Sequence, residues 1–199
     1  MKNRFTTLLT KWPIYLVGVI ASSIVTCAGI SIKCSPKLKE SIYVFAPTYS
    51  FDVKSFVKTS LELTDGIRQI TVKHADPDSE EAIRTFGSYY SICDFYIMPE
   101  SWLTRITPIA LSFTDELIHS LLPNSSSYEL YKENDTNLGI KIFDKNTNIG
   151  ASTDIISYSS LNKEQEDYYL IFRQDSIHLG ELNNSKSDNA LRVVNNLLK

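Results

Sequence analysis

Glycine, proline and cysteine are scarce in this chain of 199 residues, and each shortage excludes a class of protein. Seven glycines and seven prolines are too few for a fibrous or low-complexity protein. Three cysteines cannot build a disulfide-stapled scaffold, so the folded part must be held together by its hydrophobic core. With 43% hydrophobic and 22% charged residues the chain is expected to fold, as one domain or one domain with an appendage.

Acidic residues are absent from residues 1–39, although this stretch contains six lysines and arginines. The net charge of −3 therefore combines a basic start with an acidic body. Non-specific binding to nucleic acid requires clustered lysine and arginine side chains that neutralise phosphates. We therefore expect no nucleic-acid partner.

Charge is absent from Trp12 to Ile32, a run of 21 residues. As a helix the run is about 32 Å long, enough to cross the hydrocarbon core of a bilayer. It predicts a transmembrane anchor over residues 12–32, between a short basic cytoplasmic tail (residues 1–11) and a polar linker (residues 33–40). The membrane is thus an expected partner, and the body is expected on the extracytoplasmic side of the cell membrane.

Other interpretations of the same run stay open. A basic start with an apolar middle is also typical of a cleaved signal peptide, although the usual apolar region has only about 7–15 residues. Ile24-Val25-Thr26-Cys27 resembles a bacterial lipoprotein box, with lipid attached at Cys27, but threonine before the cysteine is unusual. Lysines and arginines nearly balance on the two sides of the run, so the positive-inside rule says little about orientation.

Apolar runs alternate with amphipathic segments in the body, residues 41–199. Strands are predicted at 41–47, 69–75, 94–98, 128–131, 138–143, 154–158 and 168–172, and helices at 51–64, from 76–81 onward, at 100–106, at 114–122 and after 185–188. Short apolar strands joined by helices predict right-handed βαβ units. The expected fold class is α/β, with a mixed, mostly parallel sheet that carries helices on both faces.

Catalytic signatures are missing from the body. There is no Gly-x-Ser-x-Gly turn and no glycine-rich phosphate loop. His74, His119 and His178 lack a pairing signature and are interpreted as surface or packing residues, and Cys93 as a small buried hydrophobe. We therefore expect no enzyme and no cofactor.

Two short motifs contain possible metal ligands. His74, Asp76 and Asp78 follow a strand, but Asp76-Pro77-Asp78 is also typical of a helix start. Asp144-x-Asn146-x-Asn148 begins like a calcium loop, yet its glycine comes one place late and its twelfth position is isoleucine. We expect no metal at either motif.

A binding site is predicted beyond the carboxyl ends of the strands, where open parallel sheets bind their ligands. Tyr49 and Trp102 follow two such ends and could stack on the apolar face of a sugar, while Glu100 and Ser101 could bond its hydroxyl groups. Alternative roles remain: Trp102 could pack on neighbouring apolar residues, and Glu100 could complement a helix dipole. These four residues form the predicted ligand-binding site.

Four stretches occur in an order that resembles a known family. They are Ile42–Phe45 as a first strand, Asp94–Ser101 as the end of a third strand, Leu138–Ile142 as a segment that leads toward a hinge, and Asp188–Lys199 as the helix after a return crossing. Together they resemble one lobe of an extracellular solute-binding protein of the ABC-transporter type, from the sugar-binding branch. The resemblance implies binding of a small polar solute such as a sugar, or of a membrane or surface protein.

The length of the chain departs from that family, whose members hold their ligand between two lobes. Only about 60 residues separate Pro123 from the final helix, too few for a second lobe. The sequence therefore predicts a lone lobe with a short hairpin in place of its partner. Two functions stay open: a solute-binding-like module without catalysis, and a structural or protein-interaction module at the cell surface that binds no small ligand.

Overall fold

The computed structural model describes residues 17, 19–20, 22–23, 36–160 and 164–199. The predicted anchor over residues 12–32 lies mostly outside these residues, as do the tail and Cys27. Within the described part of the chain, no helix is both long enough and apolar enough to cross a membrane. Residues 38–199 form one compact unit, which contains the elements β1 to β9 and α2 to α6.

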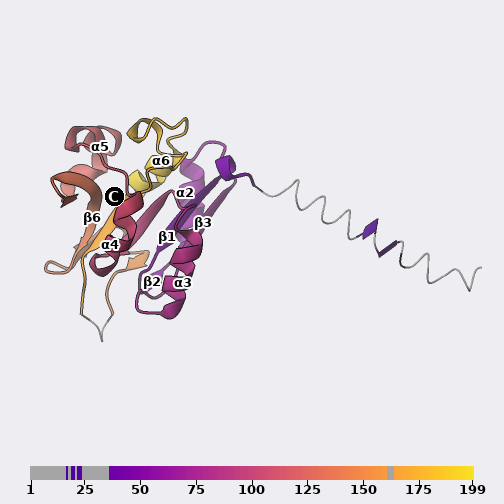
Figure 1. Ribbon diagram of the computed structural model, residues 1–199, viewed down its shortest axis with the longest axis horizontal. Helices are drawn as coiled ribbons and strands as arrows, with labels where there is room; N and C mark the ends of the chain where they lie inside the picture. Colours follow the sequence, from indigo (N-terminus) through magenta and orange to yellow (C-terminus); the bar gives the residue numbers. More distant parts are fainter. Residues whose placement is uncertain (1–16, 18, 21, 24–35, 161–163) are drawn as a thin grey trace, which may run out of the picture. The chain divides into compact units, whose positions relative to one another are not determined.

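A seven-stranded sheet forms the centre of this unit (Figure 1). Its spatial order is β3 (Gln69–His74), β1 (Ser41–Ala46), β4 (Phe95–Pro99), β9 (Tyr168–Phe172), β6 (Thr136–Asp144) and β5 (Leu130–Glu133), and β7 (Ile149–Gly150) also pairs with β6. β1 is parallel to β3 and β4, and the other pairs are antiparallel. The α/β class and the mixed sheet are confirmed, with parallel pairing confined to β3, β1 and β4. β2 (Ser50–Phe51) and β8 (Ile156–Ser157) form a separate pair.

The helices lie close to the predicted ranges. They are α2 (Val53–Leu63), α3 (Glu80–Tyr89), α4 (Leu103–Ile106), α5 (Asp115–Leu121) and α6 (Asn189–Leu197), with 3-10 turns at η1 (Leu38–Glu40), η2 (Glu100–Trp102), η3 (Thr107–Ile109), η4 (Pro123–Ser127) and η5 (Gly180–Leu182). One start differs from the prediction. Ser79, not Asp76, caps α3 by accepting a hydrogen bond from the Ala82 amide, so Pro77 precedes the helix.

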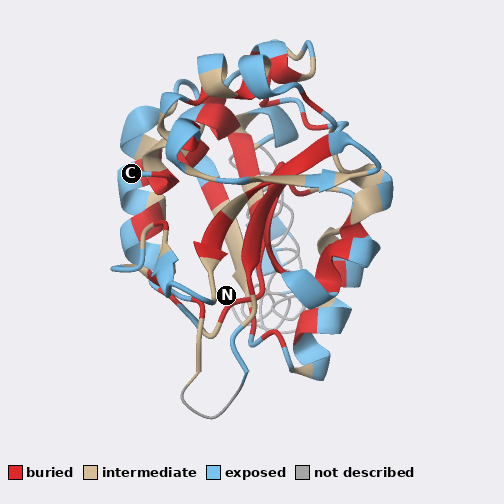
Figure 2. Cartoon of the chain, turned by 90° about the vertical axis from the view of Figure 1, so that its left-hand side faces the viewer, coloured by how far each residue is buried: buried red, intermediate tan, exposed pale blue. Residues whose placement is uncertain are grey.

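Both faces of the sheet are covered by helices. Ile42 and Val44 of β1 pack in the core under α2 and α6, while the alternating residues Tyr43 and Phe45 pack on the other face, under α3 and α4. This alternation is the period-two pattern of a strand that is buried on both sides. Figure 2 shows the buried residues concentrated in the strands and the exposed ones on the outer helix surfaces. Ile70, Tyr96 and Ile97 of the predicted strands are buried too, whereas Val72 on the edge strand β3 is half-buried.

β9 joins the two parts of the sheet. It follows β6 in the chain, yet it lies between β4 and β6 and is antiparallel to both. Gly139 of β6 permits this pairing, because a Cβ there would lie 2.8 Å from the Leu170 carbonyl oxygen. The connection from β6 to β9, residues 145–167, contains the short strands β7 and β8 in its described part. No second lobe is present in this connection as far as the structure describes it.

The predicted hairpin is β5 and β6. Asn134 and Asp135 join the strands with positive φ angles of 50° and 62°, as a two-residue type I′ turn requires. Asparagine and aspartate tolerate this left-handed conformation better than most other residues. The strand predicted at 154–158 is shorter than expected, because only Ile156 and Ser157 pair with β2.

Candidate functional site

The carboxyl ends of β1, β3, β4 and β6 lie at one edge of the sheet. The pairings require this. β1 is parallel to β3 and to β4. β4 and β6 are both antiparallel to β9, so they also run in the same direction as each other. The four predicted ligand-binding residues follow β1 and β4 at this edge, which we call the carboxyl edge. The structure gives them different surroundings.

Trp102 is buried, with 5% of its surface exposed. Its ring centroid lies 5.7 Å from that of Phe86 and 6.2 Å from that of Phe45. The guanidinium of Arg105 lies 4.7 Å from the ring centre, in a cation–π contact. Packing, the alternative role considered for Trp102, is therefore the role that the structure gives this side chain, and a sugar could reach the ring only if this part of the core opened.

Tyr49 is half-buried and lies among carboxylates. Its hydroxyl donates a hydrogen bond to Asp78 Oδ2 at 3.3 Å. Burial raises the pKa of Tyr49 to about 12, and the negative charges of Asp78, Asp76 and Glu166 add to this shift. The phenol therefore stays protonated and available as a donor at any physiological pH.

Glu100 and Ser101 are exposed, and both interact with the connection between β6 and β9. The Lys145 ammonium contacts Glu100 Oε2 at 2.9 Å, and this hydrogen bond raises the pKa of Lys145. The Ser101 amide donates to Glu166 Oε2 at 2.8 Å. These contacts join η2 to the residues that follow β6 and precede β9.

Lys141 is the residue of this edge that sequence reasoning missed. Its ammonium lies 3.0 Å from both Asp144 Oδ2 and Asp167 Oδ2, and only 12% of the side chain is exposed. Burial lowers the pKa of Lys141, but the hydrogen bonds to the two carboxylates outweigh burial and raise it above its ordinary value. The feature of the sequence that could have indicated its role is a single lysine inside the apolar stretch that forms β6.

The histidines and Cys93 have structural partners. His74 Nε2 lies 2.7 Å from the Thr48 carbonyl oxygen, and His119 Nδ1 lies 2.9 Å from Ser125 Oγ. His178 is 2% exposed, with Nδ1 3.1 Å from Ser187 Oγ. Cys93 is fully buried, which raises the pKa of its thiol above the ordinary value. The geometry thus agrees with the packing interpretation of these residues.

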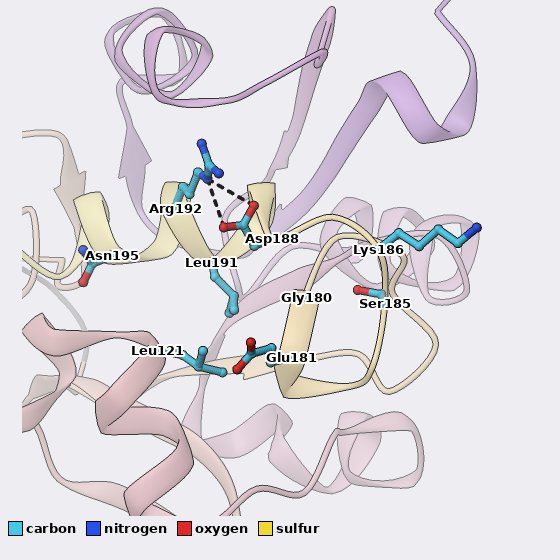
Figure 3. Close-up of a pocket in the computed structure, with 9 residues that line it drawn as sticks. All are labelled: Leu121, Gly180, Glu181, Ser185, Lys186, Asp188, Leu191, Arg192 and Asn195. Carbon is cyan, nitrogen blue, oxygen red and sulfur yellow. Dashed lines mark hydrogen bonds and ion pairs between the residues drawn. The ribbon is translucent and has the colours of Figure 1, made fainter.

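Five surface pockets in the described part of the chain are lined by none of Tyr49, Glu100, Ser101 and Trp102. One pocket of 410 Å³ lies between α5, η5 and α6, where Arg192 is already bound to Asp188 at 3.1 Å (Figure 3). Among the described residues, no group of three or more His, Cys, Asp or Glu side chains is placed to hold a metal ion.

The carboxyl edge is therefore a charged surface at which the four predicted residues line no pocket described above. Lys141 and Lys145 pair with Asp144, Asp167 and Glu100, while Asp76, Asp78 and Glu166 add further negative charge, so the edge is suited to contacts over an area more than to enclosing a small molecule. The chain matches no family model, no curated protein and no solved structure.

Proposed function

We propose that residues 38–199 form a non-catalytic binding module that resembles one lobe of an extracellular solute-binding protein and recognises its ligand or partner at the carboxyl edge. The observation that carries the proposal is the sheet order, in which β9 returns between β4 and β6 and is followed by α6. The family resemblance implies a helix after a return crossing, and this order supports the proposal for that reason. The anchor over residues 12–32 would hold the module outside the cytoplasmic membrane.

A second candidate function is a protein-interaction module that keeps the fold and binds no small ligand. The burial of Trp102 favours it, since one of the two expected stacking surfaces is inside the core. The pairing of Lys145 with Glu100 and of the Ser101 amide with Glu166 favours it as well. A small solute would have to displace these contacts, whereas a protein surface could bind over them.

Thermal shift of the full chain with a library of sugars and other small polar solutes separates the two candidates. A ligand at 100 times its Kd stabilises a folded protein by about 2.7 kcal/mol, which is readily measured. Solute binding predicts a hit whose affinity falls at least fivefold in the variants Tyr49→Phe and Lys145→Gln. The matched control is Lys54→Gln on the outer surface of α2. Failure of every solute to stabilise the chain would leave the interaction module as the surviving candidate.

The proposed location has its own test. Protease added to intact protoplasts should remove the body, residues 41–199, if it lies outside the cytoplasmic membrane. Full protection of the body, with cleavage only after lysis, would contradict the topology without bearing on the fold.

A further inference from the structure

The free edge of β5 carries a groove of 730 Å³ at the position that the next strand of the sheet would take. Five consecutive residues, Tyr128 to Lys132, line it along the strand. Asp115 and His119 of α5 line it over one face of the sheet, and Lys141, Asp167 and Tyr169 over the other. The groove therefore follows the sheet edge itself.

A second groove of 250 Å³ continues the first one toward β7. The two grooves share Tyr128, Glu129 and Lys141, and the second ends at Ile149. With 70% of its surface exposed, Ile149 is the most exposed large hydrophobic side chain in the described part of the chain. The continuous groove thus offers an apolar contact at one end and tyrosines at the other.

The backbone of β5 has hydrogen-bonding groups that point into this groove. The Lys141 amide donates to the Glu129 carbonyl at 2.8 Å, and Tyr131 pairs with Gly139. Residues alternate in an antiparallel ladder, so the amide and carbonyl of Leu130 point away from β6. Among the described residues, β5 is the last strand of the sheet on this side, and an extended peptide could therefore bond to Leu130.

Charge in the groove is predominantly negative. Four carboxylates, those of Asp115, Glu129, Asp144 and Asp167, line the two hollows against the lysines Lys132 and Lys141. Lys141 is held at 3.0 Å by Asp144 and Asp167, whereas Glu129 lies 3.7 Å from it with 76% of its side chain exposed. Glu129 is thus the carboxylate best placed to meet a cation from outside.

We propose that the free edge of β5 binds an extended, basic segment of a partner protein, which adds one antiparallel strand beside Glu129–Tyr131. The alternation of side chains in such a strand would place a lysine or arginine near Glu129. A second copy of this chain fits poorly, because two acidic edges would face each other. The bulge between Tyr131 and Lys132 interrupts the regular register of β5, so the added strand is short and its binding weak.

The test measures hydrogen exchange in the full chain, in detergent, with two acetylated hexapeptides. One alternates lysine with valine and the other alternates glutamate with valine. Binding at β5 predicts slower exchange in residues 128–133 with the lysine peptide and no change with the glutamate peptide. Glu129→Lys should weaken the lysine peptide at least fivefold, and Leu130→Pro, which removes the outward amide, should abolish its protection.

A matched charge reversal keeps the result specific. Glu81→Lys on α3, which lies on the other side of the unit from α5 and β6 in Figure 1, should leave binding unchanged. If Leu130→Pro fails to fold, the Glu129→Lys result decides the test. The Glu129 side chain is mostly exposed, so this substitution should leave the fold intact. The proposal would be overturned if the two charge reversals had equal effects on peptide binding, or if residues 128–133 gained no protection. It would also be overturned if the chain associated with itself through this segment as its concentration rose. Tyr49→Phe and Lys145→Gln test the carboxyl edge and should not alter peptide binding.

Discussion

Asp94 provides the sharpest test of how the unit is held together, because it is a carboxylate with only 3% of its surface exposed. It precedes β4, accepts a hydrogen bond from the Tyr43 amide at 2.9 Å and accepts another from the Ser176 hydroxyl at 2.6 Å. It thereby joins β1 and β4 to the loop before α6. Burial raises the pKa of Asp94 above its ordinary value of 3.8, against the opposing effect of these hydrogen bonds and of the nearby His178 and Arg173.

The sign of the pH effect follows from this direction. Between the ordinary pKa and the raised one, the folded state binds more protons at Asp94 than the unfolded state does, so the contribution of Asp94 to stability falls as pH rises. Asp94→Asn can still accept from the Tyr43 amide through Oδ1, while its Nδ2 donates to the Ser176 hydroxyl oxygen, so two hydrogen bonds remain without the charge. Relative to the wild type, its free energy of unfolding should therefore increase from acid toward neutral pH. Asp94→Ala should instead lose about 2–4 kcal/mol, because the Tyr43 amide and the Ser176 hydroxyl are left without this partner.

Urea unfolding of the full chain, followed by circular dichroism between pH 4 and pH 8, measures both effects. The difference between Asp94→Asn and the wild type cancels the contributions of other carboxyl groups, such as Asp144, whose pKa is lowered mainly by its hydrogen bond with Lys141. A difference that stays constant with pH, or that falls as pH rises, would refute the reasoning. So would an Asp94→Ala variant as stable as the wild type.

Three further predictions concern the core, the sheet pairing and the single lobe. Val44→Asp places a carboxylate at a fully buried position, which costs several kcal/mol or more in the free energy of unfolding and should abolish cooperative melting. The control Ile149→Asp, at a position that is 70% exposed, should change the free energy of unfolding by less than about 0.5 kcal/mol. Gly139→Ala should lower the free energy of unfolding in urea by about 1–3 kcal/mol, because the added Cβ would lie close to the Leu170 carbonyl oxygen. Gly87→Ala in α3, where the added Cβ has open space around it, should raise the free energy of unfolding by up to about 1 kcal/mol. Calorimetry should show one cooperative transition for the body, and any ligand found should leave the radius of gyration by X-ray scattering nearly unchanged. Two transitions, or clear compaction at constant mass, would mean that a second lobe exists.

Local patterns in the sequence were sufficient to place most of the secondary structure. The apolar run that became β1 ends before Pro47, and the acids before Ala82 mark the start of α3, because such signals act within a few residues of chain. The hairpin of β5 and β6 was predictable for the same reason. β2 was not, because two bonded residues leave no periodic pattern, and its pairing with β8, the remainder of the strand predicted at 154–158, joins distant segments.

Tertiary structure alone decided which side chains meet at the carboxyl edge and which are hidden. Trp102 and Tyr49 are both aromatic residues that follow a strand, yet one packs on Phe86 in the core and the other reaches Asp78. Lys141 meets Asp167 only because β9 returns beside β6, a pairing between segments 26 residues apart that no local signal encodes. Short-range propensity therefore determined the elements of this protein, while the long-range order of its strands determined its surface, where any binding must take place.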